Sequence, residues 1–264
     1  MFEPSPEAAK AFARVCAAAA RTSAEYALLQ ADDRVLAALS GGADSFVMLE
    51  TLLALQKRAP FDFAVEAVTF DPSFPDLDTQ KIVDYCRSRN VPHTLVSLDM
   101  KTLLENSGTE RFRRPCVRCS RLRRGKLYGV ARERQCNKLA LGHHADDLLE
   151  SFVISLVRGQ GLTTMGLNVA ADSANSSEST LRIIRPLGLT AESLVKCAAG
   201  AFDFPYAGEC PYKDELIRTG DRAWAKRELQ RWQERIDDLQ TLMLKSLGKV
   251  EAQWLLDKRF LDKS

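Results

Sequence analysis

The sequence predicts an α/β fold in which a mainly parallel sheet is wrapped by helices. Short apolar runs of strand length alternate with segments whose apolar residues recur with a helical period. This alternation is typical of strand–helix–strand units, in which the strands run parallel. Residues 168–180, rich in alanine, serine and asparagine, predict a surface loop. The predicted strands are residues 34–39, 63–70, 93–98, 138–141 and 181–184.

In the sequence, helical segments come before and after the predicted strands. Residues 1–30 predict an N-terminal helical segment, because they are rich in alanine and Pro6 suits a first helical turn. Residues 31–212 hold the predicted catalytic domain, and residues 213–264 predict a C-terminal helical extension. Apolar residues in this extension repeat at spacings of three and four, as in a packing face, a homodimer seam or an RNA surface. They are Ala225, Leu229, Trp232, Ile236, Leu239 and Met243.

Composition limits the class of protein. A chain of 264 residues that is 45% apolar can bury the core of an enzyme. Charged residues interrupt the first 30 positions and there is no run of 18 apolar residues, so we expect a cytoplasmic protein without a membrane segment. In that compartment the seven cysteines indicate free thiols, a metal site or redox chemistry. The net charge of +2 makes any affinity for nucleic acid depend on where basic residues gather.

The first strand runs directly into a glycine turn, residues 40–45, and a helical pattern follows. A strand, a glycine turn and a helix start place backbone N–H groups and the positive helix end around an anion. Gly41 and Gly42 let phosphate approach the backbone closely, while Ser40 and Ser45 add hydroxyl donors. The turn therefore predicts a pyrophosphate-binding loop, and it fits neither a Walker A loop nor a dinucleotide fingerprint.

This loop, Ser-Gly-Gly-Ala-Asp-Ser, resembles the Ser-Gly-Gly-x-Asp-Ser loop of the PP-loop ATP pyrophosphatases. That resemblance implies cleavage of ATP between the α and β phosphates and adenylation of a substrate. Asp44 would repel phosphate unless Mg²⁺ lay between them, so we interpret it as a metal ligand. Many thiolating relatives of this kind have lysine where this chain has Ala43, which leaves one positive charge fewer in the loop. Asp71, at the exit of the second strand, is a predicted nucleotide contact, although turn chemistry explains it equally well.

The fourth strand exits into Gly-His-His-Ala-Asp-Asp at residues 142–147. Ligands of parallel sheets bind beyond the carboxyl ends of the strands, so we expect Gly142 and His143 to line the nucleotide site. The two histidines of this segment could also be structural. Asp146 and Asp147 form a carboxylate pair that can hold Mg²⁺ or accept a proton, and Asp147 is the predicted general base.

Cys116 and Cys119 precede a strongly basic helical segment. Two thiols three residues apart can share one metal centre, and neighbouring positive charge favours the thiolate, but redox and zinc interpretations stay open. Between residues 111 and 134 there are ten Lys or Arg residues and one acidic residue. We therefore predict that this helix contacts RNA phosphates. Its candidate RNA-binding residues are Arg121, Arg123 and Arg124.

Three motifs together resemble the tRNA 2-thiocytidine biosynthesis family. They are Cys-x-x-Cys-Ser-Arg-Leu-Arg-Arg-Gly at residues 116–125, Ala-Leu-Gly-His-His-x-Asp-Asp at 140–147 and Ile-Arg-Pro-Leu at 184–187. With the phosphate loop, the similarity extends over residues 34–210. The set is far more specific than any one of its members.

This resemblance implies that Cys116, Cys119 and Cys210 bind a 4Fe-4S cluster in which one iron has no protein ligand. Three thiolates leave a coordination position that could bind incoming sulfide. The chain departs from the family at Cys210, where it has Cys-Pro-Tyr-Lys and the family often has a second Cys-x-x-Cys. Arg185, in the third motif, could contact phosphate or fix its loop.

The activity implied is an ATP-dependent tRNA sulfurtransferase that adenylates a base carbonyl, at cytidine C2 in the anticodon loop, and replaces oxygen by sulfur. It would need tRNA, MgATP and a sulfur donor such as a cysteine desulfurase or inorganic sulfide. Cluster-dependent thiolation of uridine or of a non-tRNA substrate is an alternative. A PP-loop amidoligase would leave the three cysteines superfluous, and a non-enzymatic RNA-binding zinc module would leave the phosphate loop unexplained.

Overall fold

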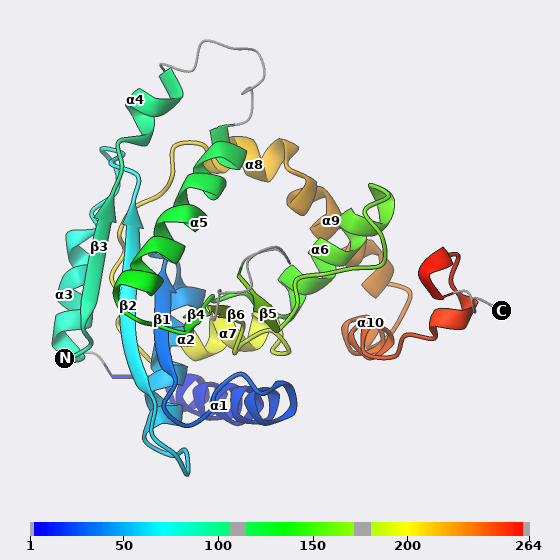
Figure 1. The fold of residues 1–264 in the computed structure, drawn as a ribbon, viewed down its shortest axis with the longest axis horizontal. Helices are drawn as coiled ribbons and strands as arrows, with labels where there is room; N and C mark the ends of the chain where they lie inside the picture. The colour runs from blue at the N-terminus through cyan, green and yellow to red at the C-terminus, as the bar shows by residue number, and fades with distance from the viewer. Residues whose placement is uncertain (1–2, 106–114, 172–180, 261–264) are drawn as a thin grey trace.

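The computed structural model of the chain describes residues 3–105, 115–171 and 181–260. A six-stranded sheet in the order β3-β2-β1-β4-β6-β5 forms its centre, with helices on both faces (Figure 1). Five strands run parallel, and β5 is antiparallel to β6 at one edge. The bounds are Arg34–Leu39 for β1, Ala64–Asp71 for β2, His93–Ser97 for β3, Lys138–Ala140 for β4, Asn168–Ala170 for β5 and Arg182–Ile184 for β6.

Side chains alternate between the two faces of the sheet along each strand, and each face packs against different helices. Val35 and Ala37 of β1 join the core beneath three helices that pack on one another, whereas Leu36 faces the other side and packs with α5. The three helices are α1 (Pro6–Tyr26), α2 (Ala43–Gln56) and α7 (Glu192–Ala199), and α5 spans Pro115–Glu133. The shorter helices α3 (Gln80–Ser88) and α4 (Met100–Glu105) precede and follow β3.

The predicted fold class is confirmed, and the predicted strands lie within one residue of β1, β2, β3, β4 and β6. One expectation was wrong, because Asn168 begins the edge strand β5 and does not belong to a loop. Its side-chain amide donates to the carbonyls of Tyr26 and Ala27, and Arg182 bonds its carbonyl, so tertiary contacts override its low strand propensity. Residues 172–180 of the predicted loop lie outside the described residues.

The C-terminal part of the chain contains the helices α8 (Lys213–Thr219), α9 (Asp221–Gln233) and α10 (Leu239–Leu247). Two helices, α9 and α10, pack against α6 (Ala145–Val157), as Figure 1 shows. Leu229 and Leu239 of the apolar stripe are buried there, whereas Trp232 and Ile236 are exposed. The stripe is divided because α9 ends at Gln233. Among the helices of the described ranges, none has the length and apolar character needed to span a bilayer.

Candidate active site

The phosphate loop lies where the order of strands along the sheet reverses. From β1 the chain proceeds to β2 on one side and later returns to β4 on the other, and ligands of parallel sheets bind beyond the strand ends at such a switch point. Gly41 has φ 84°, a conformation that favours glycine. The Ser45 hydroxyl donates to the Gly42 carbonyl at 2.7 Å and accepts from the Ser40 N–H at 3.2 Å. The loop is thus held in shape by its own hydrogen bonds.

Gly142 brings the exit of β4 against the start of α2. A Cβ atom at this position would lie 3.0 Å from the Asp44 carbonyl oxygen and from the backbone nitrogen of Ser45. A larger residue would therefore push the two strand exits apart. The structure thus joins Gly142 to the phosphate loop through packing of backbone on backbone, and its contact with a nucleotide stays a prediction.

The imidazole of His144 is buried, and three carboxylates lie around it. Its Nε2 atom lies 3.9 Å from Asp44 Oδ2 and 3.5 Å from Asp147 Oδ2, and its Nδ1 atom lies 3.6 Å from Asp146 Oδ2. Within the described residues, Nδ1 has no hydrogen-bond partner. Burial raises the pKa of Asp44, the charge of Asp147 adds to this rise, and His144 opposes it. Mg²⁺ in nucleotide sites takes one or two carboxylates together with phosphate oxygens, so Asp44 and Asp147 could serve as its protein ligands.

Both carboxylates in the first turn of α6 already accept hydrogen bonds. Asp147 Oδ2 accepts from the backbone N–H of His144 at 3.0 Å, and Asp147 Oδ1 accepts from Arg222 Nη1 at 3.0 Å. Asp146 Oδ2 accepts from the backbone N–H of Glu192 at 2.7 Å and so caps α7. Sequence reasoning missed Arg222, because it lies in a charged helix with no local motif to mark it.

His143 pairs with Arg185, the residue that follows β6. Arg185 Nε donates to His143 Nδ1 at 3.2 Å, and burial lowers the pKa of His143 to about 4. The imidazole is therefore neutral near pH 7. Arg185 is buried and also donates to the carbonyl of Gly166, so its contacts favour the loop-fixing interpretation over phosphate contact.

Asp71, the predicted nucleotide contact, takes part in a turn. Its Oδ1 atom accepts from the backbone N–H of Ser73 at 2.8 Å, and its Oδ2 atom accepts from the Ser97 hydroxyl at 3.4 Å. Ser73 has φ 57°, as expected in a tight turn. These contacts support the turn interpretation that the sequence left open, and contact with a nucleotide stays a prediction.

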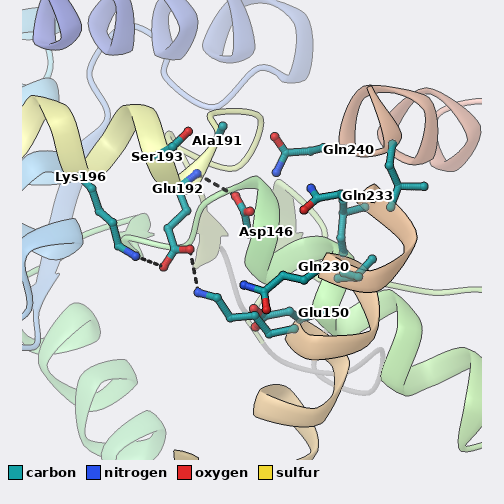
Figure 2. Close-up of a pocket in the computed structure, with 13 residues that line it drawn as sticks. Asp146, Glu150, Ala191, Glu192, Ser193, Lys196, Gln230, Gln233 and Gln240 are labelled. Atoms are coloured by element: carbon teal, nitrogen blue, oxygen red, sulfur yellow. Dashed lines mark hydrogen bonds and ion pairs between the residues drawn. The ribbon is translucent and has the colours of Figure 1, made fainter. Parts of the chain in front are cut away.

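A pocket of about 340 Å³ lies beside Asp146, between α6, α7, α9 and α10 (Figure 2). Figure 2 shows Glu192 between Lys196 and Asp146. Glu192 accepts from Lys196 Nζ at 2.8 Å and from Lys226 Nζ at 2.7 Å. Glu150 is buried in the wall of the pocket, where desolvation and the charge of Asp147 raise its pKa to about 7.

The three candidate cluster ligands come from two separate segments. Cys116 and Cys119 lie in the first turns of α5 and are partly buried, whereas Cys210 is exposed, three residues before α8. Figure 1 shows the start of α5 beside α8, and a thiolate charge on Cys210 raises the pKa of Cys116 and Cys119 across this gap. In the described part of the chain, however, no three Cys, His, Asp or Glu side chains converge closely enough to hold a metal ion.

The thiols of Cys116 and Cys119 do not have the lowered pKa that the sequence led us to expect. Burial raises the pKa of both, and the charge of Cys210 raises it further. Arg123 opposes the rise at Cys119, but burial is the larger effect. The soft donor set still fits an iron–sulfur cluster, whose binding would displace the thiol protons.

The α5 helix buries one side and exposes its arginines on the other. Leu127 and Val130 pack against the sheet, whereas Arg121, Arg123 and Arg124 are exposed. Arg111, Arg113 and Arg114 of the basic segment lie outside the described residues. Of the remaining cysteines, Cys16, Cys86 and Cys136 are buried and Cys197 is partly buried.

Comparison with known proteins agrees with this architecture. Residues 13–201 match the PP-loop domain family. A tRNA-cytidine(32) 2-sulfurtransferase of Acaryochloris marina is 32% identical, covering 99% of this chain and 89% of the relative. A protein of the same name from Alkalilimnicola ehrlichii is 34% identical, covering 90% and 73%. The U34-tRNA thiolase NcsA from Methanococcus maripaludis, solved with its 4Fe-4S cluster, shares the fold with a TM-score of 0.60, 21% identity and coverage of 91% and 89%.

Proposed function

Because the chain belongs to the PP-loop domain family and to the tRNA-cytidine(32) 2-sulfurtransferases, we propose that it replaces the C2 oxygen of a tRNA cytidine with sulfur at the expense of ATP. The observation that carries the proposal is the phosphate loop at the β1–β4 switch point of the sheet, with Asp44 and Asp147 both beside His144. We place the enzyme in the cytoplasm, where its tRNA substrate lies. A homodimer stays a prediction.

The loop performs the first half of the reaction. Backbone N–H groups at the start of α2, with Ser40 and Ser45, bind the β and γ phosphates, and Asp44 and Asp147 would hold the Mg²⁺ that neutralises part of their charge. The base carbonyl oxygen then attacks the α phosphate, and pyrophosphate leaves. This oxygen carries no proton, so the step needs no general base. The step therefore leaves Asp147 a metal-binding role, in which each carboxylate oxygen would use a lone pair that its hydrogen bond from His144 or Arg222 does not occupy.

The cysteine site serves the second half of the reaction. Cys116, Cys119 and Cys210 would hold the 4Fe-4S cluster, which supplies the sulfur chemistry when bound. Adenylation has made the former carbonyl oxygen part of a good leaving group, so AMP departs as sulfur bonds to C2. Arg121, Arg123 and Arg124 present positive charge for tRNA phosphates on the helix that starts at this site. A cysteine desulfurase or inorganic sulfide would replace the sulfur used.

Nucleoside analysis tests the proposal. Mass spectrometry of tRNA from cells without the gene should show loss of 2-thiocytidine, and purified protein should release pyrophosphate from ATP only when that tRNA is present. Loss of a thiouridine instead would favour the uridine alternative. Unchanged thionucleosides and no tRNA-dependent pyrophosphate would refute the proposed activity.

A further inference from the structure

The phosphate loop lacks a basic side chain. Residues 40–45 contain two serines, two glycines, an alanine and an aspartate, and the carboxylates of Asp147 and Glu192 add negative charge nearby. A triphosphate carries several negative charges, and one Mg²⁺ neutralises only two of them. Binding at this loop therefore calls for a cation from elsewhere in the chain.

Most basic side chains around the site are already committed. Arg185 is buried and bonded to His143 and Gly166. Lys196 and Lys226 both donate to the carboxylate of Glu192. Both lysines lie on the Glu192 side of the site, where they line the pocket between α6, α7, α9 and α10.

Arg222 differs from these residues. Its Nη1 atom donates to Asp147 Oδ1 at 3.0 Å, and within the described ranges the one hydrogen bond of its Nη2 atom is to the Met165 sulfur at 3.8 Å, which is a weak acceptor. The side chain is 53% exposed, and no other hydrogen bond of its guanidinium is made to the described residues, so its remaining N–H groups can bind an anion. Asp147 in turn lies 3.5 Å from His144, which neighbours Asp44 of the loop. Asp147 thus holds the guanidinium at the edge of the phosphate site.

We propose that Arg222, supplied by α9 from outside the PP-loop domain, is the phosphate-binding cation of this enzyme. The inference rests on the proposed function, because it assumes that ATP binds at residues 40–45. Asp147 orients the guanidinium, and its planar fork donates to oxygens of the β and γ phosphates. The C-terminal extension, beyond the domain match at residues 13–201, thereby completes the nucleotide site.

Calorimetric binding of three probes to the full-length protein tests this role. Arg222→Ala should weaken binding of the non-hydrolysable analogue α,β-methylene-ATP roughly ten- to hundredfold, as expected for charge-assisted hydrogen bonds. Pyrophosphate binding measured in EDTA should fall similarly, which separates direct contact from an indirect effect through Asp147 and Mg²⁺. Adenosine binding should not change. Arg158→Ala is the matched control, because Arg158 pairs with Asp221 across the same α6–α9 interface and lies outside the site.

A compensating substitution makes the test stricter. Ala43 is exposed at the start of α2, so Ala43→Lys in the Arg222→Ala protein should restore most of the analogue affinity by returning a cation to the loop. Wild-type analogue and pyrophosphate affinity in Arg222→Ala would overturn the inference while leaving the proposed function intact. A loss shared by Arg158→Ala, or a loss that Ala43→Lys does not repair, would also overturn it. Wild-type protein that fails to bind the analogue would refute both this inference and the proposed function.

Discussion

The nucleotide site and the cysteine site are held together in different ways. The phosphate loop is fixed by a hydrogen bond between Ser40 and Ser45, and the carboxylates of Asp44 and Asp147 both lie beside His144. Cys210, by contrast, is exposed on an irregular segment, and its thiol approaches those of Cys116 and Cys119 without forming a closed ligand set. The comparison indicates that the chain's own hydrogen bonds fix the proposed nucleotide site, whereas the three cysteines of the proposed cluster site are held less tightly.

The largest expected effect separates the two sites. Replacement of Cys116, Cys119 or Cys210 by alanine should abolish both bound iron and tRNA thiolation, because two ligands hold a cluster poorly. Binding of the ATP analogue should stay at the wild-type level. Iron and labile sulfide assays on anaerobically purified protein check the first expectation, with Cys197→Ser as the control. A full cluster in Cys210→Ala would remove this residue from the ligand set.

Substitutions in the nucleotide site should impair the reaction and leave the cluster intact. Asp44→Ala and Asp147→Asn should each reduce ATP-dependent thiolation by roughly two orders of magnitude or more, because charge on the phosphates is then poorly stabilised. The cluster absorption spectrum should not change. Asp147→Asn should also lower the melting temperature, since Asp147 caps α6 and pairs with Arg222. Wild-type turnover in both variants would exclude these carboxylates from the active site.

Preorganisation of the nucleotide site can be weakened by one methyl group. Gly142→Ala would place a Cβ atom 3.0 Å from backbone atoms of Asp44 and Ser45, so we expect a stability loss of about 1–3 kcal/mol and weaker analogue binding. Gly129→Ala is the matched control, because its Cβ would meet no atom within 4 Å in α5 and should stabilise the helix slightly. Chemical denaturation measures both. Equal stability in the two variants would show that the Gly142 contact is not tight.

The sequence predicts the nucleotide site better than the residues that the C-terminal part of the chain supplies. Residues 40–45 and 142–147 each follow a strand, so local sequence and one topological rule bring them together. Arg222 and Cys210 come from the C-terminal part of the chain, and their positions depend on how α8 and α9 pack, which short-range patterns do not encode. Residues 168–170 were misjudged for a similar reason, since the contacts of Asn168 with Tyr26 and Ala27 are made with residues distant in the sequence.

Neutralising the exposed arginines of α5, the helix that begins at the cysteine site, should have a smaller effect. Neutralising Arg121, Arg123 and Arg124 together should weaken tRNA binding roughly tenfold and flatten its dependence on salt, because fewer counterions are released. Filter binding across a salt series measures the slope. Neutralising Lys10, Arg14 and Arg21, exposed on α1, removes the same charge away from this helix and should change the slope less. Equal slopes for the two triple variants would place tRNA elsewhere.

The smallest expected effect concerns Glu150, which should change how folding stability depends on pH and should not change the reaction. Burial raises its pKa in the folded protein to about 7 from the ordinary 4.5, so the folded state binds a proton that the unfolded state releases between those values. Stability should therefore fall as pH rises from about 4.5 to 7 and level off above. Glu150→Gln cannot ionise, so it should be more stable than wild type by roughly 1–2 kcal/mol at pH 8 and nearly equal at pH 4.5. Urea denaturation in EDTA at both pH values provides the measurement, with Glu228→Gln on the outer part of α9 as the control. A stability difference independent of pH would mean that the buried carboxylate is already ionised, held so by Lys226 and Arg222.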